Sequence, residues 1–307
     1  MIKTFVKFKG ESILLAASII WGVAFVAQRA AMDYIGAYTF NGLRFLLGSI
    51  ILLPVSLLME KGPPDENKKK KSRTTIWTGL ICGLILFSAA TFQQLGIQIT
   101  LSAGKAGFIT GLYIILTPVL GIFIGKKTGI PTWLGAAAAL TGLYLLSAPD
   151  GLGSIGRGDL SLVACAFFWA AHILFISHYA SRVYPIRFSI TQFLVCSAAS
   201  FVCAYFFEPE SMNFGAIYSG RVPILFSSLV SVGIAYVLQI VGQRYVEPAK
   251  AALIFSMESL FAAIGAAVIL NEFMNLRAYS GCALIFAWII ISLVRLGKKG
   301  SNISKPI

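Results

Sequence analysis

The chain has 307 residues, of which 57% are hydrophobic and only 12% are charged, and its formal net charge is +13. A soluble domain carries about 25% charged residues, so this composition excludes an ordinary soluble fold and predicts a membrane protein. The positive residues lie mostly between the apolar segments, which indicates membrane topology and headgroup contact, and we do not expect nucleic-acid binding.

Apolar segments recur along the chain at lengths near the roughly 20 residues that a helix needs to cross a bilayer. The alternating segments typical of an outer-membrane barrel are absent from the sequence. We therefore expect an all-α membrane protein with ten transmembrane helices. The ten predicted spans are residues 12–31, 37–59, 74–97, 103–125, 131–148, 159–179, 187–207, 220–243, 248–270 and 276–296.

The loops predict how the chain is oriented in the membrane. With the N-terminus in the cytoplasm, 19 of the 25 lysines and arginines lie on the cytoplasmic side and four on the outer side. This bias places both termini in the cytoplasm, as expected for a multi-pass protein of a bacterial-type plasma membrane. The first span lacks a signal cleavage site and is expected to remain as a helix. The longest connection, residues 60–73, carries proline and a lysine run and is expected to be disordered or surface-bound.

Residues of the first half recur in the second half at a nearly constant spacing of 145 or 148 positions. The matching pairs are Trp21 and Trp169, Phe40 and Phe188, Phe45 and Phe193, Gln94 and Gln239, Gln98 and Gln243, and Lys105 and Lys250. Each half holds five predicted helices, and because five is odd, the second half must be inverted relative to the first. Inverted repeats are typical of secondary transporters, whose substrate site lies near the midplane between the repeats.

This duplication gives the expected domain organisation. The first five-helix repeat covers residues 1–148, with the basic linker 60–73 inside it, and residues 149–158 form the loop between the repeats. The second repeat covers residues 159–296, and residues 297–307 form a basic cytoplasmic tail.

Two tryptophans and one carboxylate are predicted near the middle of the membrane. Trp21 and Trp169 lie about half way along their spans, where they either pack around the pseudo-two-fold axis or form the walls of a substrate cavity. Glu258 is ten residues into span 248–270. An unpaired carboxylate at that depth should take a proton or find a cation, so Glu258 is a candidate for substrate binding or proton coupling; the alternative is a structural ion pair.

Three further polar residues are candidates for the same cavity. His172 shares a helical face with Trp169 and either titrates during transport or is held neutral by a neighbouring helix. Arg44 lies about eight residues into span 37–59, with Asn41 on the same face. Arg44 is expected either to bind an anionic group of the substrate or to pair with Glu258.

Glutamines and lysines at equivalent places in the two halves are candidates for coupling or gating. Gln94 and Gln239 begin pairs spaced four residues apart, which either line a pore or join helices. Lys105 and Lys250 each begin a predicted helix, on opposite sides of the membrane, where we expect the side chain to reach headgroups or water. Each lysine would act as a gate if it paired with a carboxylate or a loop carbonyl in one state of the cycle.

The sequence offers no motif for enzymatic or cofactor chemistry. It contains no Walker A, HExxH or GxSxG sequence. The five cysteines lie in apolar segments without metal spacing, so we expect inert thiols and neither a metal site nor a cofactor.

Three stretches give a family resemblance: "SIIWGVAFVAQRAA" with "FNGLRFLLGSIIL", "TLSAGKAGFITGLYIILTPVLGIFIGK", and "EPAKAALIFSMESLFAAIGAAVILNE". The chain resembles the EamA-type transporters of the drug/metabolite transporter superfamily over nearly its whole length. The last stretch resembles the family's proline-led ninth helix, with Glu258 in the middle and Glu272 at the end. Where the family usually has proline after the middle glutamate, this chain has Ser259, so no kink is assured there.

The resemblance implies ten helices in two inverted repeats, a central cavity lined by both, and carrier-type transport of small organic solutes. We therefore predict a secondary transporter that works by alternating access and is coupled to protons, with an amino acid or related amphipathic solute as its cargo. Its expected partners are this solute and the lipid bilayer, as a monomer or homodimer. The alternatives are a non-transport scaffold or sensor and a membrane-embedded enzyme, for which no nucleophile or metal cluster is evident.

Overall fold

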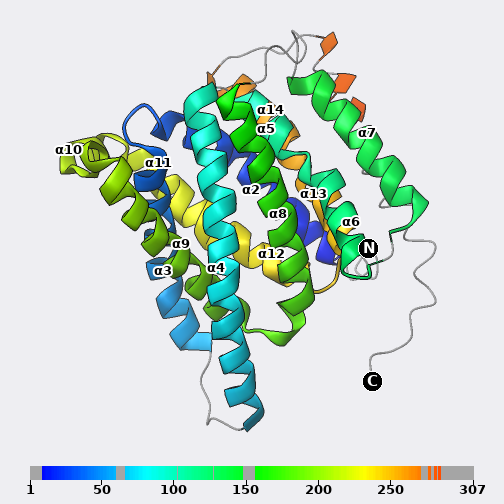
Figure 1. The fold of residues 1–307 in the computed structure, drawn as a ribbon, viewed down its shortest axis with the longest axis horizontal. Coiled ribbons are helices and arrows are strands. Elements are labelled where there is room, and N and C mark those ends of the chain that lie inside the picture. The colour runs from blue at the N-terminus through cyan, green and yellow to red at the C-terminus, as the bar shows by residue number, and fades with distance from the viewer. Residues whose placement is uncertain are drawn as a thin grey trace.

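The computed structural model describes residues 9–59, 66–101, 103–126, 128–147 and 156–270, with six further positions between 276 and 284. These residues form helices and no strand (Figure 1). The helices are α2 (Lys9–Ala31), α3 (Ala37–Met59), α4 (Glu66–Thr100), α5 (Ala103–Thr110), α6 (Tyr113–Phe123), α7 (Ile130–Ser147), α8 (Arg157–Tyr179), α9 (Pro185–Phe207), α10 (Phe214–Ser219), α11 (Arg221–Phe226), α12 (Tyr236–Gly242), α13 (Pro248–Phe255) and α14 (Met257–Leu270). Two 3₁₀ turns, η1 (Ala180–Arg182) and η2 (Pro209–Met212), and a π-helix, η3 (Ser227–Ala235), complete them.

Seven helices or joined helices among the described residues are long and apolar enough to cross a membrane. They correspond to seven of the ten predicted spans: Lys9–Ala31, Ala37–Leu58, Asn67–Thr100, Ala106–Phe123, Arg157–Arg182, Pro185–Phe207 and Arg221–Gly242. Most of the last predicted span, 276–296, lies outside the described residues. Ten spans therefore stay a prediction, while the all-helical membrane fold is established.

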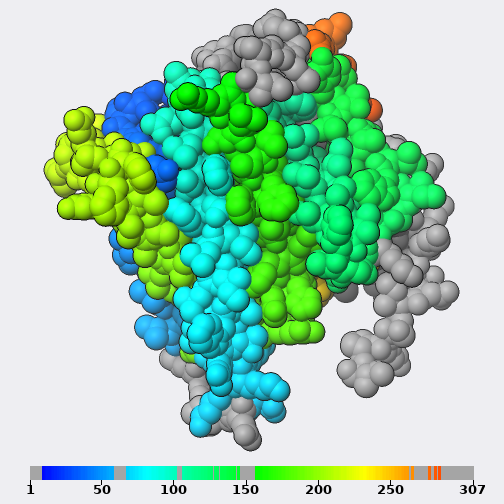
Figure 2. Space-filling view, in the orientation of Figure 1, coloured from blue at the N-terminus to red at the C-terminus, as the bar shows by residue number. Residues whose placement is uncertain are grey.

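The outside of the helix bundle is apolar. Leu57, Phe123, Phe206 and Phe207 each expose 70% or more of their surface. Figure 2 shows the face built by α4 and α8, with α9 on one side and α7 on the other. Such a surface is unfavourable in water and is satisfied by lipid chains.

One predicted boundary is wrong. The linker 60–73 was expected to be disordered or surface-bound, but α4 begins at Glu66, and its first turns extend beyond the other helices (Figure 1). Lysine and glutamate have good helix propensity, so the polar stretch continues the apolar helix. The Lys71 ammonium lies 4.5 Å from the ring centre of Tyr184, which further holds this end of α4.

Two neighbouring helices, α3 and α9, are the equivalent second helices of the two predicted repeats and run antiparallel. Phe45 of α3 packs on its repeat partner Phe193 of α9, with ring centres 5.7 Å apart. At one end of this pair, the Glu208 carboxylate accepts hydrogen bonds from the backbone amides of Tyr38 and Thr39. Glu208 thus caps the start of α3 from the end of α9.

Two close helix crossings are built alike in the two halves. Where α2 crosses α12, Gly242 packs on Leu14, and a Cβ atom on Gly10 would lie 2.6 Å from Tyr245 Cβ. Where α8 crosses α4, a Cβ atom on Gly96 would lie 2.5 Å from Leu162 Cδ2. Leu14 and Leu162 are 148 positions apart and Gly96 and Gly242 are 146 apart, so a similar glycine-to-leucine contact recurs in the two halves. Small residues let helices approach closely in membranes, where packing drives association.

Two other helices are interrupted at equivalent positions, 145 residues apart. The predicted span 103–125 is divided into α5 and α6 at Gly111 and Leu112. The predicted span 248–270 is divided into α13 and α14 at Ser256. The second break forms without the family's usual proline, because the Ser256 hydroxyl donates to the Leu253 carbonyl 2.7 Å away and the Ser259 amide bonds to Ser256 instead of continuing the α-helical pattern.

Candidate functional site

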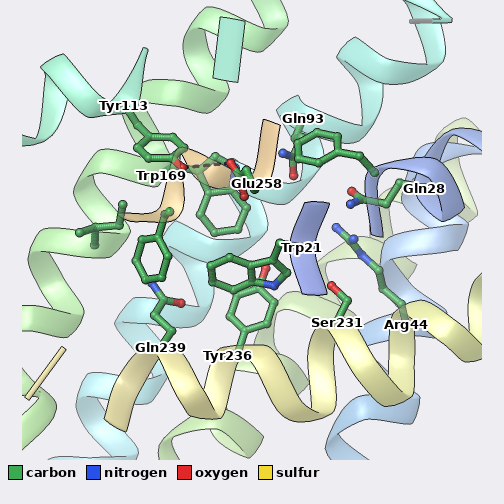
Figure 3. A pocket seen from close by; sticks show the side chains of 13 residues that line it. Trp21, Gln28, Arg44, Gln93, Tyr113, Trp169, Ser231, Tyr236, Gln239 and Glu258 are labelled. Carbon is green, nitrogen blue, oxygen red and sulfur yellow. Dashed lines mark hydrogen bonds between the residues drawn. The ribbon is translucent and has the colours of Figure 1, made fainter. Parts of the chain in front are cut away.

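A cavity with an empty volume of about 480 Å³ lies between helices of both halves (Figure 3). Its lining residues are Trp21, Phe25, Gln28, Arg44, Gln93, Tyr113, Trp169, Ile173, Ser231, Tyr236, Gln239, Phe255 and Glu258. Four of the six substrate-binding residues predicted from the sequence are among them: Trp21, Arg44, Trp169 and Glu258.

Glu258 is positioned by the break between α13 and α14. It lies in the first turn of α14, where the free amides and the helix dipole favour a carboxylate. The Tyr113 hydroxyl, from the first residue of α6, donates a hydrogen bond to Glu258 Oε1 over 3.0 Å. Both side chains are buried, and the two residues are 145 positions apart. Repeat-equivalent helix breaks therefore bring two polar groups together at one wall of the cavity (Figure 3).

Arg44 occupies a different part of the cavity (Figure 3). Its side chain is 3% exposed, and its guanidinium carbon lies 5.0 Å from the ring centre of Phe40 and 4.8 Å from that of Phe45. Among the described residues, no carboxylate lies within ion-pair distance of Arg44, and its Nε atom has no hydrogen-bond partner. The predicted alternative of a structural Arg44–Glu258 ion pair is therefore not formed in this conformation.

Aromatic rings form much of the remaining cavity wall. The ring centre of Trp21 lies 5.1 Å from that of Tyr236 and 5.3 Å from that of Phe255. Trp169, its repeat partner, lies 6.3 Å from the same Tyr236 ring. The two tryptophans thus do both things considered from the sequence, because they pack on one shared tyrosine and also face the cavity.

His172 and Asn41 do not line the described cavity. His172 is fully buried, packs against Trp169 and Tyr236, and its Nε2 atom lies 3.1 Å from Gln192 Oε1. Gln192 is the repeat equivalent of Arg44, 148 positions later. Asn41 is also fully buried, and neither its amide nitrogen nor its amide oxygen has a hydrogen-bond partner among the described residues. His172 therefore supports the cavity wall from behind in this conformation.

The predicted glutamines are divided between cavity and helix contacts. Gln239 faces the cavity, and its Oε1 atom is buried without a hydrogen-bond partner among the described residues. Gln94 instead donates to the Gln28 carbonyl of α2 over 3.1 Å, and Gln243 donates to the Ile173 carbonyl of α8 over 2.9 Å. Gln94 and Gln243 therefore join helices.

One predicted gate residue has a clear partner. Lys250, in the first turn of α13, forms an ion pair with Glu11 of α2, with 2.6 Å between Nζ and Oε1. The side chains are 18% and 15% exposed, so water screens this pair only partly. Lys105 begins α5 at the equivalent place, and its side chain lies outside what the structure describes.

Several lining residues were not predicted from the sequence. Tyr113 could have been predicted, because it lies 145 positions before Glu258. Glu11, which lies outside the cavity lining, was also missed, although its ion-pair partner Lys250 was a predicted gate residue. Ser231 and Tyr236 carry no such signal, because they face one cavity only through the π-helix η3. Across the described residues no group of histidine, cysteine and acidic side chains could hold a metal ion.

The comparison with known proteins agrees with this architecture. The model of the EamA-like transporter family matches the chain twice, over residues 8–148 and 156–294. An "Uncharacterized transporter" of Archaeoglobus fulgidus is 28% identical over 288 residues, covering 92% of this chain and 85% of the relative. The "Uncharacterized transporter YoaV" of Bacillus subtilis is 20% identical over 292 residues, covering 93% of this chain and 97% of the relative.

A third relative and a solved structure are also similar to this chain. The "Uncharacterized inner membrane transporter YedA" of Escherichia coli K12 is 26% identical over 171 residues, which cover 55% of this chain and 52% of the relative. A solved structure described only as "Crystal structure of protein" superposes with a TM-score of 0.76 at 19% identity, over 95% of this chain and 99% of the other. At that identity the likeness shows the fold alone.

Proposed function

The chain belongs to the EamA-like transporter family, and on that premise we propose that it carries a small organic metabolite across the plasma membrane by alternating access. The observation that carries this proposal is the cavity lined by both halves, in which Arg44 and Glu258 are separate polar groups among aromatic walls. We place this site in ten transmembrane helices forming two inverted repeats, with both termini in the cytoplasm.

The equivalent helix crossings support an alternating mechanism. The contact of Gly242 with Leu14 and the contact of Gly96 with Leu162 are built alike and involve equivalent helices of the two halves. In an inverted repeat such contacts lie toward opposite membrane faces, so loosening one while keeping the other would expose the cavity to one side at a time. The similar packing of the two crossings favours two states of comparable free energy.

The cavity chemistry supports an amino acid or related amphipathic solute as cargo. Trp21, Trp169 and Tyr236 offer an apolar wall for a side chain or ring. Glu258 can receive a cationic group, and Arg44 can receive an anionic one. A charged group of the solute would thereby replace water at each residue during passage.

Glu258 is also our candidate for proton coupling. Its one hydrogen-bond donor among the described side chains is the Tyr113 hydroxyl, and among the same residues it has no ion-pair partner. A carboxylate in the membrane interior is costly without a counter-ion, so exchange between a proton and a solute cation at this residue would couple the two movements. His172 remains a second candidate, acting through its contact with Trp169.

We assign gating to the lysines at the starts of α5 and α13. The Lys250–Glu11 ion pair joins α13 to α2 next to the Gly10 crossing, and it would have to break for that end to open. By the same repeat, Asp159 is the equivalent of Glu11, 148 positions later, and it lies in the first turn of α8. Lys105 and Asp159 are therefore the equivalent residues at the opposite end.

Counterflow in proteoliposomes tests the carrier proposal. Vesicles containing the full chain are loaded with unlabelled amino acids, one per preparation, and the uptake of the same labelled amino acid is followed. A carrier produces transient accumulation that protein-free vesicles lack, and a Glu258→Gln variant tests whether an imposed pH gradient drives net uptake through that residue. Solute binding, detected as a raised melting temperature, without counterflow would instead favour the scaffold or sensor alternative.

A further inference from the structure

Arg44 is a buried cation for which the described residues provide no anion. It is held over the rings of Phe40 and Phe45, and those rings leave its hydrogen-bonding edge unsatisfied, because its Nε atom has no partner among the described atoms. An arginine carries five N–H donors in a planar fork that fits a carboxylate with two parallel hydrogen bonds. Its side chain reaches the cavity, as Figure 3 shows, so a ligand in the cavity can reach it.

The π-helix η3 brings a hydroxyl group to the same part of the cavity. Ser231 lies in the middle of η3 and lines the cavity together with Tyr236 and Gln239 of α12. In a regular α-helix, residues five apart point in directions about 140° apart, so Ser231 and Tyr236 would not share a wall. The i to i+5 bonding of a π-helix returns the fifth residue to nearly the same face. The π-helix therefore allows Ser231 to face the cavity beside Arg44 (Figure 3).

We infer that Arg44 and Ser231 form an anion-binding subsite of the cavity, which takes the carboxylate of an amphipathic solute. Arg44 supplies the charge and the paired donors, and the Ser231 hydroxyl supplies a further donor. This inference rests on the proposed carrier function and specifies which end of the solute lies near Arg44 and which lies near Glu258.

The rest of the cavity is consistent with this polarity. Glu258 and Tyr113 form a separate, acidic region of the wall, which suits a cationic or hydrogen-bond-donating end of the solute (Figure 3). Gln192, the repeat equivalent of Arg44, is occupied by His172. The anion-binding subsite at Arg44 thus has no counterpart at Gln192, although the helix scaffold is repeated. This asymmetry fixes the direction in which a solute lies.

Paired ligands that differ only in the carboxylate test the subsite. Purified full-length protein is titrated with 3-phenylpropanoate and 3-phenylpropionamide, and with phenylalanine and phenylalaninamide, and the affinities are compared by calorimetry and by shifts in melting temperature. A charge-assisted hydrogen bond should favour each carboxylate on the order of tenfold to a hundredfold in the wild type. The ratio should fall to about one in Arg44→Gln.

The Arg44→Gln change is matched to the fold, because glutamine occupies the equivalent position in the other half. Arg44→Lys keeps the charge without the planar fork and should retain part of the ratio, while Ser231→Ala should lower it by a few-fold. Arg29→Gln is the control, because Arg29 pairs with Asp33 away from the cavity, and it should leave the ratio unchanged.

The inference is overturned if neither carboxylate binds, if acid and amide bind equally, or if Arg44→Gln keeps the wild-type ratio. These results are distinct from failure of the proposed function. Arg44-dependent carboxylate binding without counterflow would keep the subsite and reject the carrier, whereas counterflow without carboxylate preference would keep the carrier and reject the subsite.

Discussion

The two halves of the molecule use the same scaffold but carry different chemistry. The crossing of α2 with α12 and the crossing of α4 with α8 repeat the same glycine-to-leucine packing, and both α5–α6 and α13–α14 are broken at equivalent positions. The residues that face the cavity are not repeated in this way, since Tyr113 stands where the second half has Glu258, and Gln192 where the first half has Arg44.

This difference indicates that helix packing must be symmetric for an exchange between two states, whereas the polar groups of the binding site must not be. Helix packing sets the relative free energies of the two states, so equivalent packing keeps both accessible. A binding site must instead recognise a solute that has two unlike ends, and an exact repeat of its polar groups would present the same group to both ends. The asymmetry is therefore expected to reside in the cavity lining.

The largest expected effect comes from removing the charge of the Tyr113–Glu258 pair at the helix breaks. Glu258→Gln keeps the shape and the hydrogen bond from Tyr113 but removes the charge, and we expect it to abolish uptake driven by a pH gradient while counterflow persists. Tyr113→Phe removes only the hydrogen bond and should lower driven uptake by a few-fold. Uptake by Glu258→Gln that still responds to the pH gradient would remove this residue from the coupling mechanism.

The symmetric crossings can be broken one at a time. Gly10→Val and Gly158→Val each introduce atoms that clash, since a Cβ atom would lie 2.6 Å from Tyr245 Cβ or 2.8 Å from Thr100 Cγ2. We expect each to lower the free energy of unfolding by about 1–3 kcal/mol, measured by thermal unfolding in detergent micelles.

The control for these variants is Gly265→Ala, because a Cβ atom there would lie 3.8 Å from Val26 Cγ2, at ordinary contact distance. That change should leave stability equal or slightly raised. A large loss in only one of the two crossing variants would show that the crossings are less equivalent than their packing indicates.

The lysines at the two ends provide a smaller and more specific test. Lys250→Ala removes the ion pair with Glu11 and should shift the population of states by a few-fold toward opening of that end, while Lys105→Ala should shift it the opposite way. Distances between spin labels at the exposed positions Ser12 and Arg182 report on the shift. Arg221→Ala is the control, because Arg221 is exposed and, among the described residues, its hydrogen bond and its ring contact are both to the nearby Tyr218. Shifts in the same direction, or none, would contradict the gating assignment.

The smallest effect is expected from the repeated tryptophans. Trp21→Phe and Trp169→Phe each keep an aromatic wall against Tyr236 but reduce its area, and we expect less than about tenfold weaker solute binding, of similar size in both. Titration calorimetry on both variants measures this. If only one variant loses affinity, the solute lies against one half of the cavity, which would sharpen the asymmetry described above.

The sequence by itself determined the membrane class and the duplication, because apolar length and residue spacing are properties of the chain alone. Of the six residues it predicted for the cavity, Trp21, Trp169, Arg44 and Glu258 line it and Asn41 and His172 do not. For Arg44 and Glu258 the physical reason is that a charged residue at mid-membrane depth is costly unless it faces the interior. Tyr113 and Glu258 are also separated by the repeat spacing of 145 positions, but Tyr113 was not predicted from the sequence as a partner of Glu258.

Only the tertiary structure decided which polar groups meet. Whether Glu258 pairs with Arg44 or with Tyr113 depends on how α3, α6 and α14 pack, and the hydrogen bond to Tyr113 answers that for this conformation. His172 was turned to Gln192 behind the wall by the packing of α8 on its neighbours. Ser231 reaches the cavity through π-helical bonding, which no apolar period in the sequence reveals.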